Sequence, residues 1–179
     1  MSTQIMLSII AAVFLISSAQ AQHASYAGQE KRDIKALSAD DIKQHLTGAG
    51  MGYARAAELN NHPGPMHALE LADKLALTPE QRTAAEKLMA EHKAGARAIG
   101  AKFIEAERAL DQLFASGKVS EAALAQHVRE VAALQGEYRL SHLETHRRLR
   151  PLLTEKQVHL YAQLRGYTGD QASAGLHKH

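Results

Sequence analysis

Apolar residues recur at steps of three and four along the middle of the chain, between Pro79 and about Ala115. This spacing places them on one face of an α-helix. The stripe, which includes one histidine, consists of Ala85, Leu88, His92, Ile99, Phe103, Ala106, Leu110 and Leu113. A helix of this extent is about 55 Å long, so we expect it to dominate the fold.

A second stripe follows, from Glu121 to about Arg150, after a break at residues 116–118. Its predicted inward positions are Leu124, Val128, Val131, Leu134, Tyr138 and Leu149. Because a short connection joins the two stripes, they predict an antiparallel helical hairpin. No segment of the sequence shows the alternation typical of a strand. The predicted fold class is all-α, a long antiparallel helical hairpin with short flanking helices.

One five-residue pattern marks the start of two predicted helices. Residues 77–81 read LTPEQ, and residues 153–157 read LTEKQ. In each, the Thr hydroxyl can accept a hydrogen bond from a free N–H in the first turn, and the Gln can reach back to the Thr N–H, forming a capping box. Pro79 suits the first helical position, where a missing N–H costs nothing. We therefore expect helices to begin at these boxes, the second continuing to about Arg165.

The chain divides into four predicted parts. Residues 1–21 contain an apolar run that is too short to span a bilayer, followed by the small-residue cleavage site Ala19-Gln20-Ala21. They predict a cleavable export signal and a periplasmic location; an uncleaved anchor is the alternative, because no Lys or Arg precedes the apolar run. Residues 22–37 are predicted to be a flexible N-terminal segment, residues 38–167 a helical domain, and residues 168–179 a disordered tail that contains histidine.

Composition excludes several function classes. The chain has no Cys, which removes disulfides, thiolate metal sites and Cys nucleophiles. A net charge of +2 argues against a dedicated nucleic-acid binder. Zincin, P-loop and nucleophile-elbow motifs are absent from the sequence, so we do not expect an enzyme or an organic cofactor. Histidine is abundant, with eleven residues.

Three histidines and a methionine of the two long helices are predicted to meet. With the turn centred at residues 117–118, His146 faces Met89, and His142 lies beside His92. Imidazole with thioether suits borderline or soft ions, so these four residues predict a site for a divalent transition metal such as Zn, Ni or Cu. The alternative interpretation is a core histidine at position 92 and solvated histidines on the partner helix.

A second histidine cluster surrounds a Pro-Gly-Pro break. It consists of His62, Met66, His67 and Glu70, and it is an alternative metal site. Ordinary polar surface at a helix entry is the other interpretation of these residues. The terminal residues His23, His177 and His179 are expected to collect metal weakly and nonspecifically.

The two LTxxQ boxes, the charged hairpin between them and the export signal together resemble the periplasmic LTxxQ superfamily. This superfamily includes Spy/CpxP stress chaperones and ZraP/CnrX-type heavy-metal proteins, and the resemblance covers roughly Met51 to Tyr167. CnrX-type sensors bind metal through helix-borne His, Glu and Met, including a His followed four residues later by Met. His142 and His146 have that spacing, with His in place of Met. Spy-like proteins form a curved helical dimer that holds unfolded clients without ATP.

The leading functional expectation is an exported protein that binds or senses heavy metals in the envelope stress response. The alternative is a Spy/CpxP-like, ATP-independent chaperone that suppresses aggregation. A homodimer is expected because a long, thin hairpin buries its apolar stripe poorly by itself. Unfolded client proteins or a membrane-bound regulator are the other partners that the resemblance implies.

Overall fold

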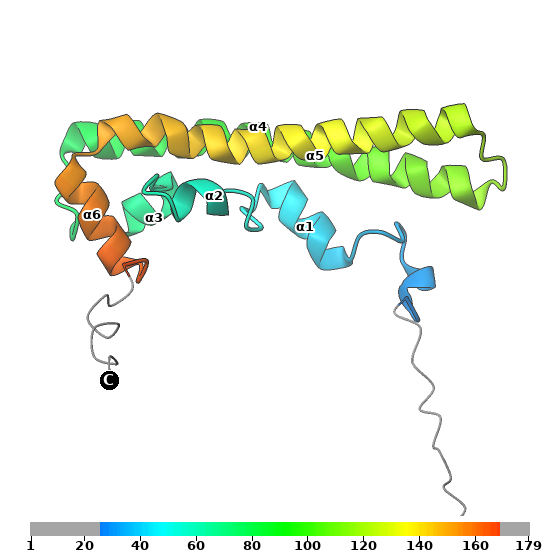
Figure 1. The fold of residues 1–179 in the computed structure, drawn as a ribbon, viewed down its shortest axis with the longest axis horizontal. Helices are drawn as coiled ribbons and strands as arrows, with labels where there is room; N and C mark the ends of the chain where they lie inside the picture. The colour runs from blue at the N-terminus through cyan, green and yellow to red at the C-terminus, as the bar shows by residue number, and fades with distance from the viewer. Residues whose placement is uncertain (1–25, 169–179) are drawn as a thin grey trace, which may run out of the picture.

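The computed structural model describes residues 26–168. Their regular secondary structure is entirely helical, which confirms the predicted fold class. Helices α4 (Pro79–Ala115) and α5 (Glu121–Leu149) form the antiparallel hairpin (Figure 1), and α4 begins at the predicted residue. The predicted export signal, 1–21, and all but the first residue of the predicted tail lie outside the described residues.

Short helices line one side of the hairpin. Figure 1 shows α1 (Ala39–Thr47), α2 (Arg55–Glu58) and α3 (Pro65–Glu70) following one another along it. Helix α6 (Glu155–Leu164) turns away at the end of the hairpin opposite its tip. Two 3-10 helices complete the fold, Gln29–Lys31 before α1 and Arg150–Leu152 after α5. None of the helices in residues 26–168 combines the length and the apolar character that a membrane span requires.

Both LTxxQ boxes form capping boxes, and their glutamines also bond to each other. Thr78 and Gln81 cap α4 reciprocally, and Thr154 and Gln157 cap α6 in the same way. The Gln81 Nε2 donates to Gln157 Oε1 at 3.0 Å, and the Gln157 Nε2 donates back to Gln81 Oε1 at 2.8 Å. The repeated motif therefore fastens the start of α4 to the start of α6, a contact that the capping pattern alone does not predict.

Two apolar clusters hold the short helices to the hairpin. The larger one gathers residues from α3 and the turn after it, from the two boxes and from the adjoining ends of α4, α5 and α6: Ala68, Ala72, Leu75, Leu77, Ala85, Leu88, Leu149, Leu153, Val158 and Tyr161. The smaller one, nearer the tip of the hairpin, consists of Ile34, Leu37, Phe103 and Ile104. Val128 was expected to face inwards, but it is 48% exposed.

The expectation of a flexible segment at 22–37 is wrong for its described part, residues 26–37. Ile34 is fully buried in the smaller cluster. The backbone N–H of Lys35 donates to the Asp111 carboxylate at 3.1 Å, and Arg108 forms an ion pair with Asp33. The segment is polar in composition, but it contains one apolar residue, Ile34, whose burial against the hairpin holds the segment in place.

Candidate metal centre

A cavity of about 740 Å³ lies between the hairpin and the N-terminal segment. All four residues of the predicted hairpin site line it: Met89, His92, His142 and His146. The opposite wall comes from residues 47–67, which include α2 and the first residues of α3. Along the hairpin, the cavity lies between the two apolar clusters. Here the inward positions of the long helices are occupied by His92 and His142 instead of apolar residues.

His92 and His142 lie against each other, as the hairpin register predicts. Their ring centroids are 4.4 Å apart, with the ring planes at 67°. His142 is 4% exposed, and its Nε2 is buried without a hydrogen-bond partner, as is the Nδ1 of His92. Buried polar atoms normally have a partner, so two unpartnered ring nitrogens at one cavity require an explanation.

Both rings are held in the neutral form. Burial, together with the smaller effect of positive charge on His92, His146 and His45, lowers the pKa of His142 to about 4. Burial also lowers the pKa of His92, with a contribution from His146, while a hydrogen bond to the backbone of Ser141 acts in the opposite direction. A neutral imidazole has one nitrogen with a free lone pair, which is the form that binds metal ions.

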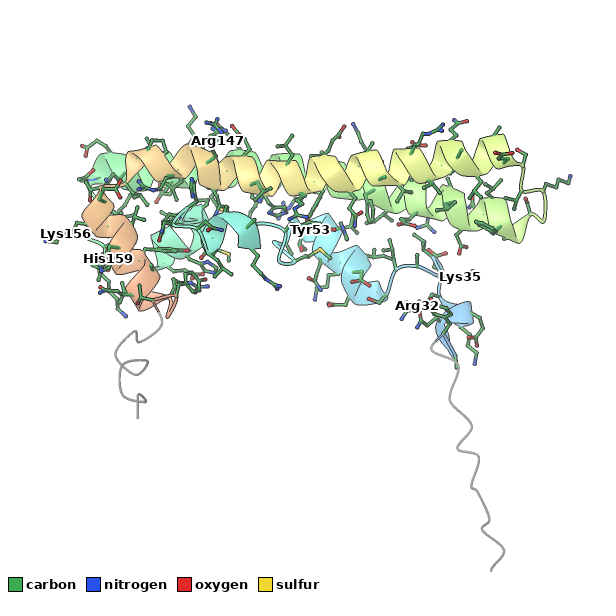
Figure 2. The ribbon with its side chains drawn as sticks, viewed as in Figure 1. Arg32, Lys35, Tyr53, Arg147, Lys156 and His159 are labelled. Carbon is green, nitrogen blue, oxygen red and sulfur yellow. The ribbon has the colours of Figure 1, made fainter. Side chains whose placement is uncertain are left out.

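Aromatic rings fix the His142 side chain from two sides. Tyr138 lies one turn earlier on α5, 4.8 Å from His142 between ring centroids, and its hydroxyl donates to the Ala49 carbonyl at 2.9 Å. The ring of Tyr53 stacks at 6.1 Å from His142. Figure 2 shows Tyr53 on the side of the N-terminal segment that faces the hairpin. The His142 ring is therefore held in one position by the aromatic rings packed against it.

His146 is oriented by a backbone carbonyl. Its Nδ1 lies 2.8 Å from the carbonyl oxygen of His62, and because a carbonyl can only accept, the Nδ1 carries the proton. In the neutral ring the Nε2 then carries the lone pair. The ring lies close over Gly64, where an added Cβ would come within 2.9 Å of the Nε2. Metal-binding histidines typically have this arrangement, with the distal N–H fixed by a carbonyl or carboxylate.

Glu58, at the end of α2, is the acidic residue of the cavity wall, and no pattern in the sequence marks it as part of a site. Its carboxylate accepts hydrogen bonds from Tyr161 and, at 3.0 Å, from Tyr167. It also lies 3.5 Å from the Nδ1 of His146 and 3.6 Å from that of His67. Burial, then the bond to Glu58, raises the pKa of Tyr161. Glu58 thus ties the N-terminal segment to α5 and α6 beside the cavity.

The alternative cluster does not assemble as predicted. Met66 and His67 line the cavity, whereas His62 and Glu70 do not. The Nδ1 of His62 bonds to the carbonyl of Asn60 at 2.7 Å. Glu70 is exposed on the far end of α3. Met66 and His67 therefore share a cavity with the hairpin residues, and the carboxylate that lines this cavity is that of Glu58, not of Glu70.

Within residues 26–168, no three His, Asp or Glu side chains stand close enough together to hold a metal ion as they are placed. The arrangement that is already formed is the pair of His92 and His142, with the Met89 thioether one turn earlier on α4. Whether these residues bind metal stays a prediction, and His23, His177 and His179 lie outside the described residues.

Comparison of the chain with protein-family models, with curated proteins and with solved structures gave no match. The resemblance to the LTxxQ superfamily therefore stays a prediction that rests on the two boxes and the hairpin.

Proposed function

We propose that this protein is an exported transition-metal-binding protein of the heavy-metal or envelope stress response, and that it holds its ion in the cavity beside His142. The observation that carries the proposal is the pair of buried, unpartnered ring nitrogens, His92 Nδ1 and His142 Nε2, at one cavity. An unpaired buried nitrogen costs free energy of folding, and a bound ion would recover that cost.

Further support comes from the elements that meet at this cavity. His92 lies on α4 and His142 on α5, while Met66 and His67 lie on α3. An ion bound to both long helices would cross-link the hairpin, and a ligand from the N-terminal segment would strengthen the packing of that segment against it. A client or a membrane-bound regulator could recognise the more rigid surface that results.

The test is a thermal melt with and without Zn, Ni or Cu ions. The starting protein is the full chain carrying His23→Ala, His177→Ala and His179→Ala, which removes the terminal histidines as trivial binders. At an ion concentration about 100 times the dissociation constant, binding contributes about 2.7 kcal/mol, which raises the Tm of a domain of this size by roughly 5–10 °C. We expect this shift in the starting protein and its loss when His92→Ala and His142→Ala are added.

The matched control removes two other histidines, through His127→Ala and His159→Ala. His127 lies on α5 outside the cavity lining, and Figure 2 shows His159 on the outside of α6. This control variant should keep the full shift. Equal shifts in the two double variants, or no shift with any ion, would refute the cavity site.

The chaperone remains the second candidate, because the hairpin exposes apolar side chains among basic ones. Phe114, Val128 and Leu140 are 56%, 48% and 62% exposed, and Arg129 and Arg139 neighbour the last two. Such a surface suits weak contact with unfolded chains. Suppression of client aggregation by the metal-free protein, retained in the His92 and His142 double variant, would favour this function over metal binding.

A further inference from the structure

We propose that the ion held in this cavity is a monovalent soft ion, copper(I), bound by His92, His142 and Met89. This inference rests on the proposed function and narrows the ligand from a divalent transition metal to copper(I). It is carried by three features of the cavity: where the methionines lie, how many nitrogen ligands are already in place, and what charge surrounds them.

The methionines gather at this one cavity. The described part of the chain contains three of them, and all three line it: Met51, Met66 and Met89. They come from the turn before α2, from α3 and from α4, so no single helix pattern brings them together. Thioether sulfur is a soft ligand that suits copper(I), whereas the usual protein ligands of zinc are thiolate, imidazole and carboxylate.

The number of ligands also fits a soft monovalent ion. Zinc sites in proteins are almost always four-coordinate, with N, O or thiolate ligands, and no such group of three His, Asp or Glu is assembled among residues 26–168. Copper(I) accepts two or three ligands. The unpartnered nitrogens of His92 and His142 supply two, and Met89, three residues before His92, lies on the same face of α4.

The charge at the cavity disfavours a divalent ion. Among the described residues that line it, Glu58 is the single carboxylate, against Arg55 and Lys93. Glu58 is already engaged by Tyr161 and Tyr167. The desolvation cost of an ion grows with the square of its charge, so a monovalent ion carries about a quarter of the cost of a divalent one. Neutral imidazole and thioether ligands therefore suit copper(I) best.

Met66 gives the ion an entry. Its side chain is 47% exposed while it lines the same cavity that encloses His142. A thioether at the surface can take copper(I) from solution and pass it inwards to the buried nitrogens, because methionine has three rotatable bonds and adapts to its partner.

The experiment measures copper(I) affinity by anaerobic competition with a chromogenic chelator, with silver(I) as a redox-inert probe and Zn and Ni titrations alongside. The protein is the full chain with the three terminal histidines replaced by Ala. We expect copper(I) and silver(I) to bind at one per chain and more tightly than Zn or Ni. Met89→Leu, which keeps the side-chain volume, should weaken copper(I) binding by about tenfold or more and leave Zn and Ni affinities unchanged.

Two further variants sharpen the result. Met89→His should raise the affinity for Zn and Ni, because it offers a third nitrogen, while His159→Ala on the outside of α6 should change nothing. X-ray absorption of the copper-loaded protein should show a sulfur ligand that Met89→Leu removes. Tighter binding of Zn or Ni that depends on His142, or a copper(I) affinity unaffected by Met89→Leu, overturns this inference and leaves the proposed function standing. Failure of every ion to bind overturns both.

Discussion

Neighbouring histidines of α5 are held in place by different contacts. His142 is neutral because it is buried beside His92, and the aromatic rings of Tyr138 and Tyr53 fix it. His146, one turn later, is directed by the His62 carbonyl instead. Because His142 is buried, the folded protein should lose stability in acid, since the unfolded chain binds a proton on this imidazole more readily than the folded protein does.

The first prediction concerns the pH dependence of stability in the metal-free, chelator-treated protein. An unfolded His142 takes up a proton below pH 6.5, whereas the folded protein binds it only near pH 4. Between these values the unfolded state holds more protons, so the free energy of unfolding falls as the pH falls, by up to about 3 kcal/mol from this residue. Denaturant titrations across this range should give a shallower pH dependence for His142→Leu.

A direct measurement accompanies the titrations. The NMR signal of the His142 imidazole in the folded protein should not shift between pH 7 and pH 5. If it titrates in that window, or if His142→Leu and the original protein lose stability in parallel, then burial does not hold this ring neutral. The remaining pH dependence in the variant is expected from His92, whose pKa is lowered by burial and by the nearby His146.

The contact between His92 and His142 could be predicted from sequence because two continuous helices and one short turn fix which residues face each other. Glu58 could not be predicted in this way. It ends a four-residue helix with no apolar pattern, and its partners come from α3, α5, α6 and the residues after α6. Only the complete fold brings those groups to one carboxylate.

At the scale of the elements, α1 crosses α4 in unusually close contact. A Cβ at Gly100 of α4 would lie 2.4 Å from the His45 carbonyl oxygen in α1. The absence of a side chain there lets α1 place the His45 ring against Phe103 and Tyr138, at 4.7 and 5.0 Å between centroids. Helix α4 also contains Gly95, where an added Cβ would meet nothing within 4 Å.

These two glycines make a matched pair for the second prediction. Gly95→Ala should stabilise the protein by about 0.5–1 kcal/mol, because Ala favours a helix more than Gly does. Gly100→Ala gains the same propensity but forces α1 away from α4, so we expect a net loss of about 1–3 kcal/mol. Chemical denaturation measures both. Equal stabilisation by the two substitutions would show that α1 does not pack against α4 at this position.

Helix starts could be predicted more reliably than packing between helices. The capping residues of α4 and α6 lie in the sequence itself, so both starts were placed correctly. The close approach at Gly100 and the anchoring of Ile34 depend on which helix lies opposite, and neither leaves a local pattern. That is also why a segment of polar composition was expected to be flexible although the hairpin holds its described residues.

For the whole molecule, the hairpin is long and open at one end, and the repeated motif closes that end. Figure 1 shows the chain passing from the short helices into α4 at the same end of the hairpin where α5 leads into α6. The side-chain nitrogen of Gln81 also donates to the Leu152 carbonyl at 2.8 Å, and that of Gln157 donates to the Leu75 carbonyl at 3.3 Å. Each glutamine amide therefore has all its hydrogen-bond partners only while the starts of α4 and α6 stay together.

The expected homodimer stays a prediction, which sedimentation at micromolar concentration would test.

The last prediction is a double-mutant cycle on this closure. Gln81→Ala or Gln157→Ala alone should lower the free energy of unfolding by about 1–3 kcal/mol, because each leaves the other amide without its partner. The double variant should lose less than the sum, with a coupling of about 1 kcal/mol. Asp41, which caps α1 without touching either box, provides the control: Asp41→Ala and Gln157→Ala should be additive. Additivity of the two glutamine substitutions would mean that the boxes act as separate caps, and that another contact closes the open end of the hairpin.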